Sequence, residues 1–449
     1  MKKISNNAIT DGVIWKEMLR YFFPLLFGTF FQQLYNTVDA IIVGRFVGSS
    51  ALAAVGGSAS LIVSLFVGFF TGLASGATVI IAQYYGAKRE NEVTKAVSNA
   101  IALALTGGAT FMIAGIWLAP FGIYILNTPA ETVDMSILYL RIYFVGMIPN
   151  LIYNMGAGIL RAVGDSKRPL IVLIFTTFSN IILDVVLVLF LNMGVAGVAI
   201  ATIICQVISS ICILYILTHL DASYKLDLSR ISFDTRILFK TLHIGIPAGV
   251  QAIMYTLSNL VIQAAINSFG KDAVSAWAAY GKIDALLWMI TGSLGISVTT
   301  FVGQNYGAGK YDRVRQTVRQ GFVITALFTA ILSGLMYFFR MPLLSLFTTE
   351  KDVLEFGDIM MRAMVPYYIL YISIEVCSGA LRGIGKSIIP TIMTLVGVCF
   401  LRVVWIICAL PIRNQITTVV YSYPITWTVT SVMFLIYYFH TAKRKLNNR

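Results

Sequence analysis

The sequence predicts an all-α polytopic membrane protein of twelve transmembrane helices, arranged as two six-helix lobes related by pseudo-two-fold symmetry along the membrane normal. Three observations predict it. Of the 449 residues, 58% are hydrophobic and only 12% are charged, whereas soluble proteins have about 25% charged residues. Twelve apolar runs are each about 20 residues or longer, which is the length that crosses the hydrocarbon core. Finally, motifs of the first half recur in the second half.

The spans follow from the places where apolar runs begin and end. The first residues are polar and mixed in charge, with no cleavable signal peptide, so the first span begins near Phe22. We expect an N-terminal lobe over 1–218, a cytoplasmic loop over 219–241 and a C-terminal lobe over 242–449. The expected spans are 22–44, 55–83, 97–119, 137–160, 169–191 and 195–218, then 242–267, 275–303, 320–340, 362–381, 389–410 and 417–439.

The two halves repeat at a fixed offset. QYYGAKREN at Gln83 matches QNYGAGKYD at Gln304, and LRAVGDSKRP at Leu160 matches LRGIGKSIIP at Leu381, each 221 residues later. Six spans later the chain faces the same way, so these are parallel repeats. We interpret the matched loops as turns, in which Gly ends one helix and Pro begins the next. Two such lobes would leave a cleft between them and could rock about it.

Basic residues alternate between loops. One set of alternate loops and ends carries 24 Lys and Arg residues and the other carries 5. By the positive-inside rule, both termini are expected in the cytoplasm and the protein in the cell membrane. The same rule explains the net charge of +13, so we expect no nucleic-acid partner.

A polar stripe lies within the first apolar span. Gln32, Asn36 and Asp39 fall at i, i+4 and i+7, on one face of a helix. An ionised carboxylate at a helix centre costs roughly 2.5–3.5 kcal/mol in a bilayer, so Asp39 must face protein or water. We interpret the stripe as half of a cation site in a transporter. The alternative is a polar stripe that only holds helices together.

The fifth and sixth spans carry matching stripes. Asn180 and Asp184 are i, i+4 neighbours with Thr177 one turn earlier, and Thr202 and Gln206 are again i, i+4. Carboxylate, amide and hydroxyl oxygens suit a small hard cation such as Na⁺. Two close carboxylates also bind a proton readily, because they repel each other when both are charged. The sequence alone leaves Na⁺ and H⁺ open.

The second half lacks this pair of acids, since Val261 and Trp405 occupy the positions that match Asp39 and Asp184. Glu375 is the best acidic candidate there, and an ion pair with Lys282 or Arg402 is the alternative role for it. We expect the C-terminal residues of a substrate cavity to be Gln251, Tyr255, Lys282, Tyr371 and Glu375.

No enzymatic motif is present. The sequence has no phosphate-binding Gly-x-x-x-x-Gly-Lys-Ser/Thr loop, no Ser–His–Asp or metal-ligand cluster, and three isolated histidines. We therefore expect no enzyme activity and no resident cofactor. The energy for transport would come from an ion gradient.

Taken together, PLLFGTFFQQLYNTVDAIIVGRFVG from Pro24, ASGATVIIAQYYGAKREN from Ala74 and the paired loops resemble the multidrug and toxic compound extrusion (MATE) family along nearly the whole chain. The resemblance implies an antiporter that exports organic cations and other xenobiotics in exchange for Na⁺ or H⁺. It implies a cation site at Asp39, Asn180, Asp184 and Thr202. Tyr255 and Tyr371 stand where NorM-like members carry acids, so the chain resembles the DinF-like branch more closely.

The expected partners are small organic molecules, the coupling cation and the lipid bilayer, and we expect a monomer. A lipid-linked oligosaccharide flippase of the same superfamily is the main alternative, and it should have a cationic cavity for pyrophosphate. A channel or receptor is a second alternative, but the parallel repeat favours a rocking transporter.

Overall fold

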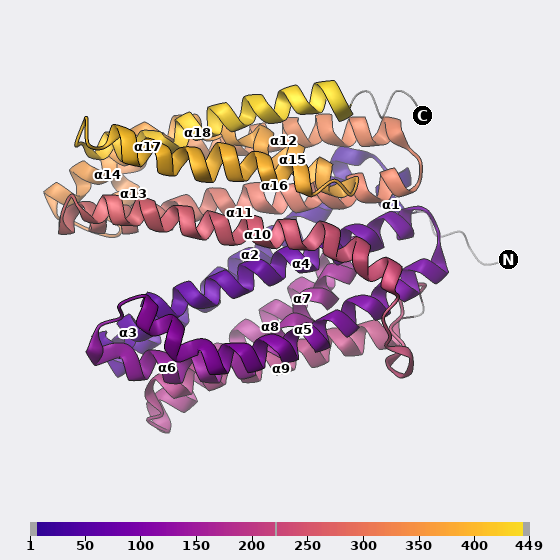
Figure 1. Cartoon of the computed structure of the whole chain (residues 1–449), viewed down its shortest axis with the longest axis horizontal. Helices are drawn as coiled ribbons and strands as arrows, with labels where there is room; N and C mark the ends of the chain where they lie inside the picture. Colours follow the sequence, from indigo (N-terminus) through magenta and orange to yellow (C-terminus); the bar gives the residue numbers. More distant parts are fainter. Residues whose placement is uncertain (1–6, 221, 443–449) are drawn as a thin grey trace. The chain divides into compact units, whose positions relative to one another are not determined.

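The computed structural model describes residues 7–220 and 222–442. Within these ranges every regular element is a helix, and Figure 1 shows long helices with a few short ones between them. The basic residues near the two ends of the chain, such as Lys2 and Arg449, were counted among the loop charges above and lie outside the described residues.

Most predicted spans lie within one helical segment, but 137–160 crosses the bend between α6 and α7, and 320–340 runs past the end of α12 at Phe338. Ten segments are long and apolar enough to cross a membrane, and the pair α6–α7, bent by 51°, gives an eleventh. The twelfth is α2, which has 29 residues and a lower hydropathy because of its polar stripe. The helices are α1 (Ala8–Asp11), α2 (Ile14–Ile42), α3 (Ser49–Ala54), α4 (Ser60–Gly86), α5 (Glu90–Ile125), α6 (Ala130–Val145), α7 (Met147–Ala162), α8 (Lys167–Asp184), α9 (Gly194–His219), α10 (Thr235–Asn267), α11 (Lys271–Gly307), α12 (Tyr311–Phe338), α13 (Arg340–Ser345), α14 (Lys351–Met364), α15 (Ile372–Gly383), α16 (Ile388–Thr394), α17 (Leu401–Ala409) and α18 (Ile416–Tyr437).

The chain forms two compact units. The first holds residues 23–249, and the second holds the residues up to Phe22 together with those from Val250 onward. The chain therefore passes from one unit to the other within α2 and again within α10, rather than in the 219–241 loop. The functional division into lobes at residues 218 and 242 stays a prediction.

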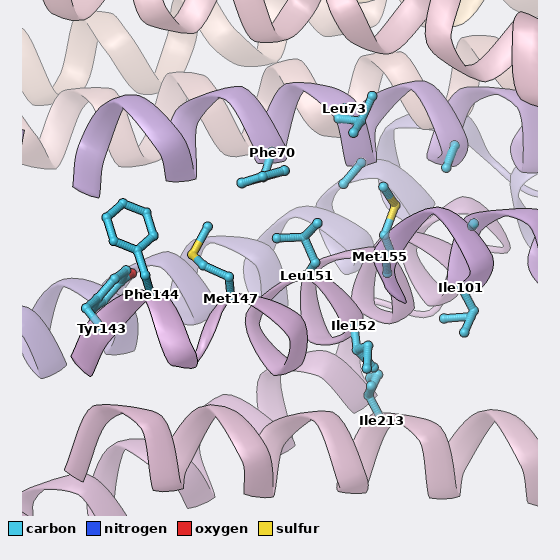
Figure 2. Close-up of a cluster of buried hydrophobic side chains, with 14 of the residues drawn as sticks. Phe70, Leu73, Ile101, Tyr143, Phe144, Met147, Leu151, Ile152, Met155 and Ile213 are labelled. Carbon is cyan, nitrogen blue, oxygen red and sulfur yellow. The ribbon is translucent and has the colours of Figure 1, made fainter. Parts of the chain in front are cut away.

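The core of the 23–249 unit is built around α7, which packs against α4, α5 and α9. Figure 2 shows Leu151 and Met155 of α7 pointing toward Phe70 and Leu73 of α4, while Ile152 points the other way, toward α9. These side chains are buried. Since lipid tails are as apolar as these side chains, close packing rather than exclusion of water holds the helices together.

Two Gly-x-x-x-Gly pairs let α4 and the first half of α10 approach closely within the same unit. A Cβ atom added to Gly72 would meet the backbone of Gly249, and one added to Gly245 would lie 2.8 Å from the Leu73 carbonyl oxygen. Gly76 faces Gly245 in the same way. Small residues at this spacing are typical of helix crossings in membranes.

In the second unit, α11 packs against α12, α14 and α15, and it also holds the short helix α1. Lys310 Nζ lies 2.6 Å from Asp11 Oδ1, and Arg313 Nη2 donates to the Gly12 carbonyl at 2.7 Å and to that of Ile9 at 3.1 Å. The segment before the first span is thus fixed to the second unit.

The turns confirm the internal repeat. Lys88 and Gly309, 221 residues apart, both have positive φ angles, 56° and 71°. Gly164 and Gly385, again 221 apart, have φ angles of 97° and 85°. The interpretation of the matched loops as helix-ending turns is confirmed, although Lys88 adopts the left-handed conformation without being glycine.

Candidate functional site

The structure brings together the two acids of the 23–249 unit. Asp39 comes from α2 and Asp184 is the last residue of α8, and their carboxyl groups lie within hydrogen-bonding reach of each other. Asp184 is fully buried and Asp39 is 9% exposed. Neither carboxylate can donate a hydrogen bond, so this contact is stable only with a proton or a cation between the groups.

Unsatisfied polar atoms lie on the two helices that carry this pair and on α9. Seven buried side-chain atoms on α2, α8 and α9 have no hydrogen-bond partner in the described part of the chain, and six of them are oxygens. Buried polar atoms are nearly always paired in proteins, because an unpaired one costs free energy. The atoms are Asp39 Oδ1, Asn180 Oδ1 and Nδ2, Asp184 Oδ1 and Oδ2, Thr202 Oγ1 and Gln206 Oε1.

Local breaks in the helices accompany these residues. A π-helical segment, Val185–Phe190, begins directly after Asp184, and another, Val43–Val47, follows Asp39 by one turn. Such π-helical insertions are frequent at functional sites, because they shift side chains relative to a regular helix. Thr177 on α8 also donates to the Phe31 carbonyl of α2 at 3.5 Å, which links the two helices.

A cavity of about 470 Å³ adjoins the pair inside the same unit. Asp39 lines it, whereas Asn180 and Asp184 do not, so Asp39 stands between the cavity and the more deeply buried residues. Of the other residues expected near the site, Gln32, Asn36, Thr177, Thr202 and Gln206 all line the cavity.

Several lining residues were missed by the sequence reasoning. Tyr139 and Tyr143 come from α6, with ring centroids 6.1 Å apart, and Asn150 and Asn154 come from α7. Both pairs have i, i+4 spacing, which is a signal that the sequence contained. Their joint orientation depends on the 51° bend between α6 and α7, which the sequence did not indicate.

The cavity is acidic rather than basic. Among the described residues that line it, Asp39 is the only acid and none is Lys, Arg or His. Tyrosine rings and amide oxygens complete the wall. Such a lining attracts cations and offers faces for cation–π contact, and it differs from the cationic cavity expected of a pyrophosphate-binding flippase.

The expected C-terminal residues lie in the second unit. The hydroxyl groups of Tyr255 and Tyr371 are 3.3 Å apart, and Tyr371 donates to Glu375 at 3.5 Å. Gln251 donates to Thr394 at 3.3 Å, and Lys282 is exposed. Three of the five residues thus form one chain of contacts.

Glu375 does form an ion pair, but the predicted partners, Lys282 and Arg402, are wrong. Glu375 lies 3.8 Å from Arg382, which is seven residues later and so on the same face of α15. Arg402 instead donates to Asn259 at 3.2 Å and stacks 3.9 Å from the centre of the Tyr423 ring.

Asp284 holds an aromatic cluster together, a role that was not predicted from the sequence. Tyr280 and Tyr368 both donate to its Oδ1 atom, and Trp288 Nε1 donates to Oδ2 at 2.6 Å. The buried Trp427 ring packs against Trp288 and Tyr368. Unlike Asp39 and Asp184, this acid has donors for both oxygens.

Comparisons with known proteins agree with this architecture. The MatE family model matches residues 24–186 and 247–407. "Probable multidrug resistance protein YoeA" of Bacillus subtilis is 28% identical over 440 residues, covering 96% of this chain and 95% of that protein. "Probable multidrug resistance protein NorM" of Thermotoga maritima is 24% identical, covering 86% and 83%.

A solved structure described as an outward-facing conformation of a multidrug resistance MATE family transporter is 22% identical, with a TM-score of 0.90 over 100% of this chain and 99% of that one. That likeness shows the same fold. The family match covers both repeats and contains the acid pair of α2 and α8. The protein is therefore a multi-pass membrane protein that belongs to the MatE family.

Proposed function

We propose that the protein is a multidrug efflux antiporter that exports organic cations in exchange for an ion bound at Asp39 and Asp184. The observation that carries the proposal is the pair of facing carboxylates, with unpartnered oxygens on the same helices and on α9, at the wall of an acidic cavity. The cavity volume of about 470 Å³ falls in the range that holds drug-sized molecules. Relatives that bear the name multidrug resistance protein support the same substrate class.

We propose Na⁺ as the coupling ion. A proton shared by the two carboxyl groups would leave the oxygens of Asn180, Thr202 and Gln206 unsatisfied. A sodium ion beside the carboxylates would use oxygens of these kinds as ligands, because carbonyl, hydroxyl and carboxylate oxygens are the ligands that hard cations prefer. The donor set therefore fits a metal cation better than a proton alone.

Exchange follows from competition for Asp39. When the ion binds from outside, it neutralises the carboxylate that an organic cation in the cavity would face, so the cation leaves. When the ion leaves toward the cytoplasm, Asp39 regains its charge and the cavity attracts new cargo. The ion drives export because it binds more tightly to one state of the transporter than to the other.

The residues of the second unit favour a single ion-coupling site, the one in the 23–249 unit. Tyr255 and Tyr371, at the positions where NorM-like members carry acids, contact each other through hydroxyl groups. This pair favours assignment to the DinF-like branch. We further propose a monomer in the cell membrane with both termini in the cytoplasm, as the loop charges indicate.

The test is drug resistance in cells that express Asp39→Asn. This variant keeps the shape of the side chain and removes its charge, so we expect resistance to ethidium to fall to the level of cells without the transporter. Asp134→Asn is the matched control, since Asp134 is an exposed acid on α6 of the same unit. Full resistance in Asp39→Asn at equal expression would refute the proposal.

A further inference from the structure

A second cavity, of about 310 Å³, opens where α4 ends and where α5 and α10 begin. It lies within the 23–249 unit and is separate from the acid pair. Four basic and two acidic side chains line it, together with Tyr84, Asn91 and Ile237. The charged residues are Arg89, Lys95, Arg236 and Lys240, with Glu92 and Asp234.

One of the two acids is already engaged. Asp234 lies 3.7 Å from Lys95, and its Oδ1 accepts from the backbone N–H of Ile237 at 3.1 Å. Its backbone carbonyl accepts from Asn99 at 2.8 Å. Asp234 therefore neutralises Lys95 and caps α10, and it does not balance the other cations of the cavity.

Three cations remain available. Lys240 Nζ donates to the Tyr84 hydroxyl at 3.0 Å and lies 5.4 Å from the centre of its ring. Arg89 and Arg236 are exposed, and neither takes part in an ion pair within residues 7–220 and 222–442. These three cations, which we call the basic triad, face one hollow rather than open surface.

The backbone adds to this field. The 36-residue helix α5 begins at Glu90, and its N-cap residue Arg89 makes no side-chain cap. Arg89, Asn91 and Glu92, at this helix start, line the cavity. The N-terminus of a long helix favours an anion, so the helix start adds to the attraction of the basic side chains.

The surroundings indicate a lipid as the source of the anion. The basic triad lies at the ends of helices that are apolar enough to span a membrane, which is the level of the phospholipid headgroups. Phe239, on α10 between Arg236 and Lys240, is 67% exposed and offers an apolar contact beside them. Basic pockets between helices at this level suit anionic headgroups.

We propose that the basic triad forms a binding site for the phosphate of an anionic phospholipid headgroup. A bound headgroup bridges the start of α5 and the start of α10, and so fixes the segment by which the chain enters α10. This site is independent of the acid pair and of the identity of the coupling ion.

The experiment measures lipid retention by mass spectrometry of the intact full-length protein, titrated in neutral detergent with dioleoylphosphatidylglycerol or dioleoylphosphatidylcholine. We expect the wild type to retain phosphatidylglycerol preferentially. The double variant Arg89→Gln/Arg236→Gln should bind it roughly tenfold or more weakly, since each basic residue contributes about a fivefold change. The control Arg45→Gln/Lys271→Gln removes two exposed charges from loops of the other set and should bind as the wild type does.

A variant that is expected to strengthen lipid binding, rather than weaken it, separates the effect from a loss of folding. Glu92→Gln removes the remaining free acid of the cavity and should strengthen phosphatidylglycerol binding, whereas Glu131→Gln, an exposed acid at the start of α6, should not. Equal loss in the control double variant, or equal retention of phosphatidylcholine, would overturn the proposal. Displacement of the lipid by millimolar inorganic phosphate would also overturn it, because the site would then bind the free anion.

Discussion

The two carboxylates at the centre of the site differ in one respect that separates their roles. Asp39 lines the cavity, whereas Asp184 is fully buried and does not line it. In the exchange that we propose, Asp184 therefore holds the ion without contacting cargo, and competition between ion and cargo falls to Asp39 alone.

In the sodium site that we propose, the hydroxyl of Thr202 is a ligand, whereas a proton held by the two carboxyl groups does not need it. Thr202→Val has nearly the same shape but removes an oxygen ligand, and a hydrogen bond or similar contact to a charged group is worth about 1.5–3 kcal/mol. We expect the Na⁺ concentration for half-maximal efflux to rise roughly tenfold or more. Efflux from proteoliposomes at graded external Na⁺ measures this.

Thr176→Val is the control for that variant. Thr176 also lines the cavity, but its hydroxyl already donates to the Val172 carbonyl at 3.0 Å, so it is not a free ligand. An unchanged Na⁺ requirement in Thr202→Val, or an equal rise in both variants, would exclude a sodium ligand at this position.

The sequence could predict Asp39, Asn180, Asp184 and Thr202 as candidates because polar stripes inside apolar runs are local signals. That Asp39 and Asp184 touch is a tertiary fact, and only the structure provides it. The predicted partners of Glu375 were wrong because both lie on other helices. Its actual partner, Arg382, lies two turns away on the same helix, α15.

Among the elements, the crossing of α4 and α10 depends on glycine. A methyl group at Gly245 would lie 2.8 Å from the Leu73 carbonyl oxygen, so the helices must separate. We expect Gly245→Ala to lower the free energy of unfolding by about 1–3 kcal/mol, as overpacking does. Thermal unfolding in detergent measures the change.

Gly292→Ala provides the comparison for this crossing. A Cβ there has no neighbour within 4 Å, so the replacement should not lower stability, and the better helix propensity of alanine should favour it. Similar melting temperatures for the two variants would contradict the close approach of α4 and α10.

The contacts of Arg313 hold the first residues of the chain to α12. Arg313→Gln removes the donors to the Ile9 and Gly12 carbonyls, so the amides of the α1 segment should exchange hydrogen at least about tenfold faster, since even one charge-assisted bond is worth about 1.5–3 kcal/mol. Hydrogen–deuterium exchange of peptides near residues 8–17 reports this. Arg319→Gln, an exposed residue of the same helix, should leave exchange unchanged, and equal protection in both variants would disprove the role of Arg313.

The positions of the spans were predictable because hydropathy is a local property of about 20 residues. The bend between α6 and α7, the π-helical segments and the passage of α2 and α10 between units were not. Each depends on which helices pack together, so no window of sequence contains the information.

At the scale of the whole molecule, the two halves share the conformations of their turns but not the pair of acids. Lys88 and Gly309 share a backbone conformation 221 residues apart. Val261 and Trp405, by contrast, replace the two acids in the second half. Of two related halves, only the first therefore carries the facing pair of acids, which is the arrangement expected when one half carries the coupling ion.

The most direct test of coupling at the acid pair is ethidium efflux from proteoliposomes with an imposed Na⁺ gradient, compared with a pH gradient and with no gradient. Wild-type protein should move ethidium uphill when Na⁺ is higher on the side that ethidium moves toward. Asp39→Asn and Asp184→Asn should show no uphill movement at equal reconstitution. Uphill efflux by either variant, or by the wild type without any ion gradient, would contradict the account.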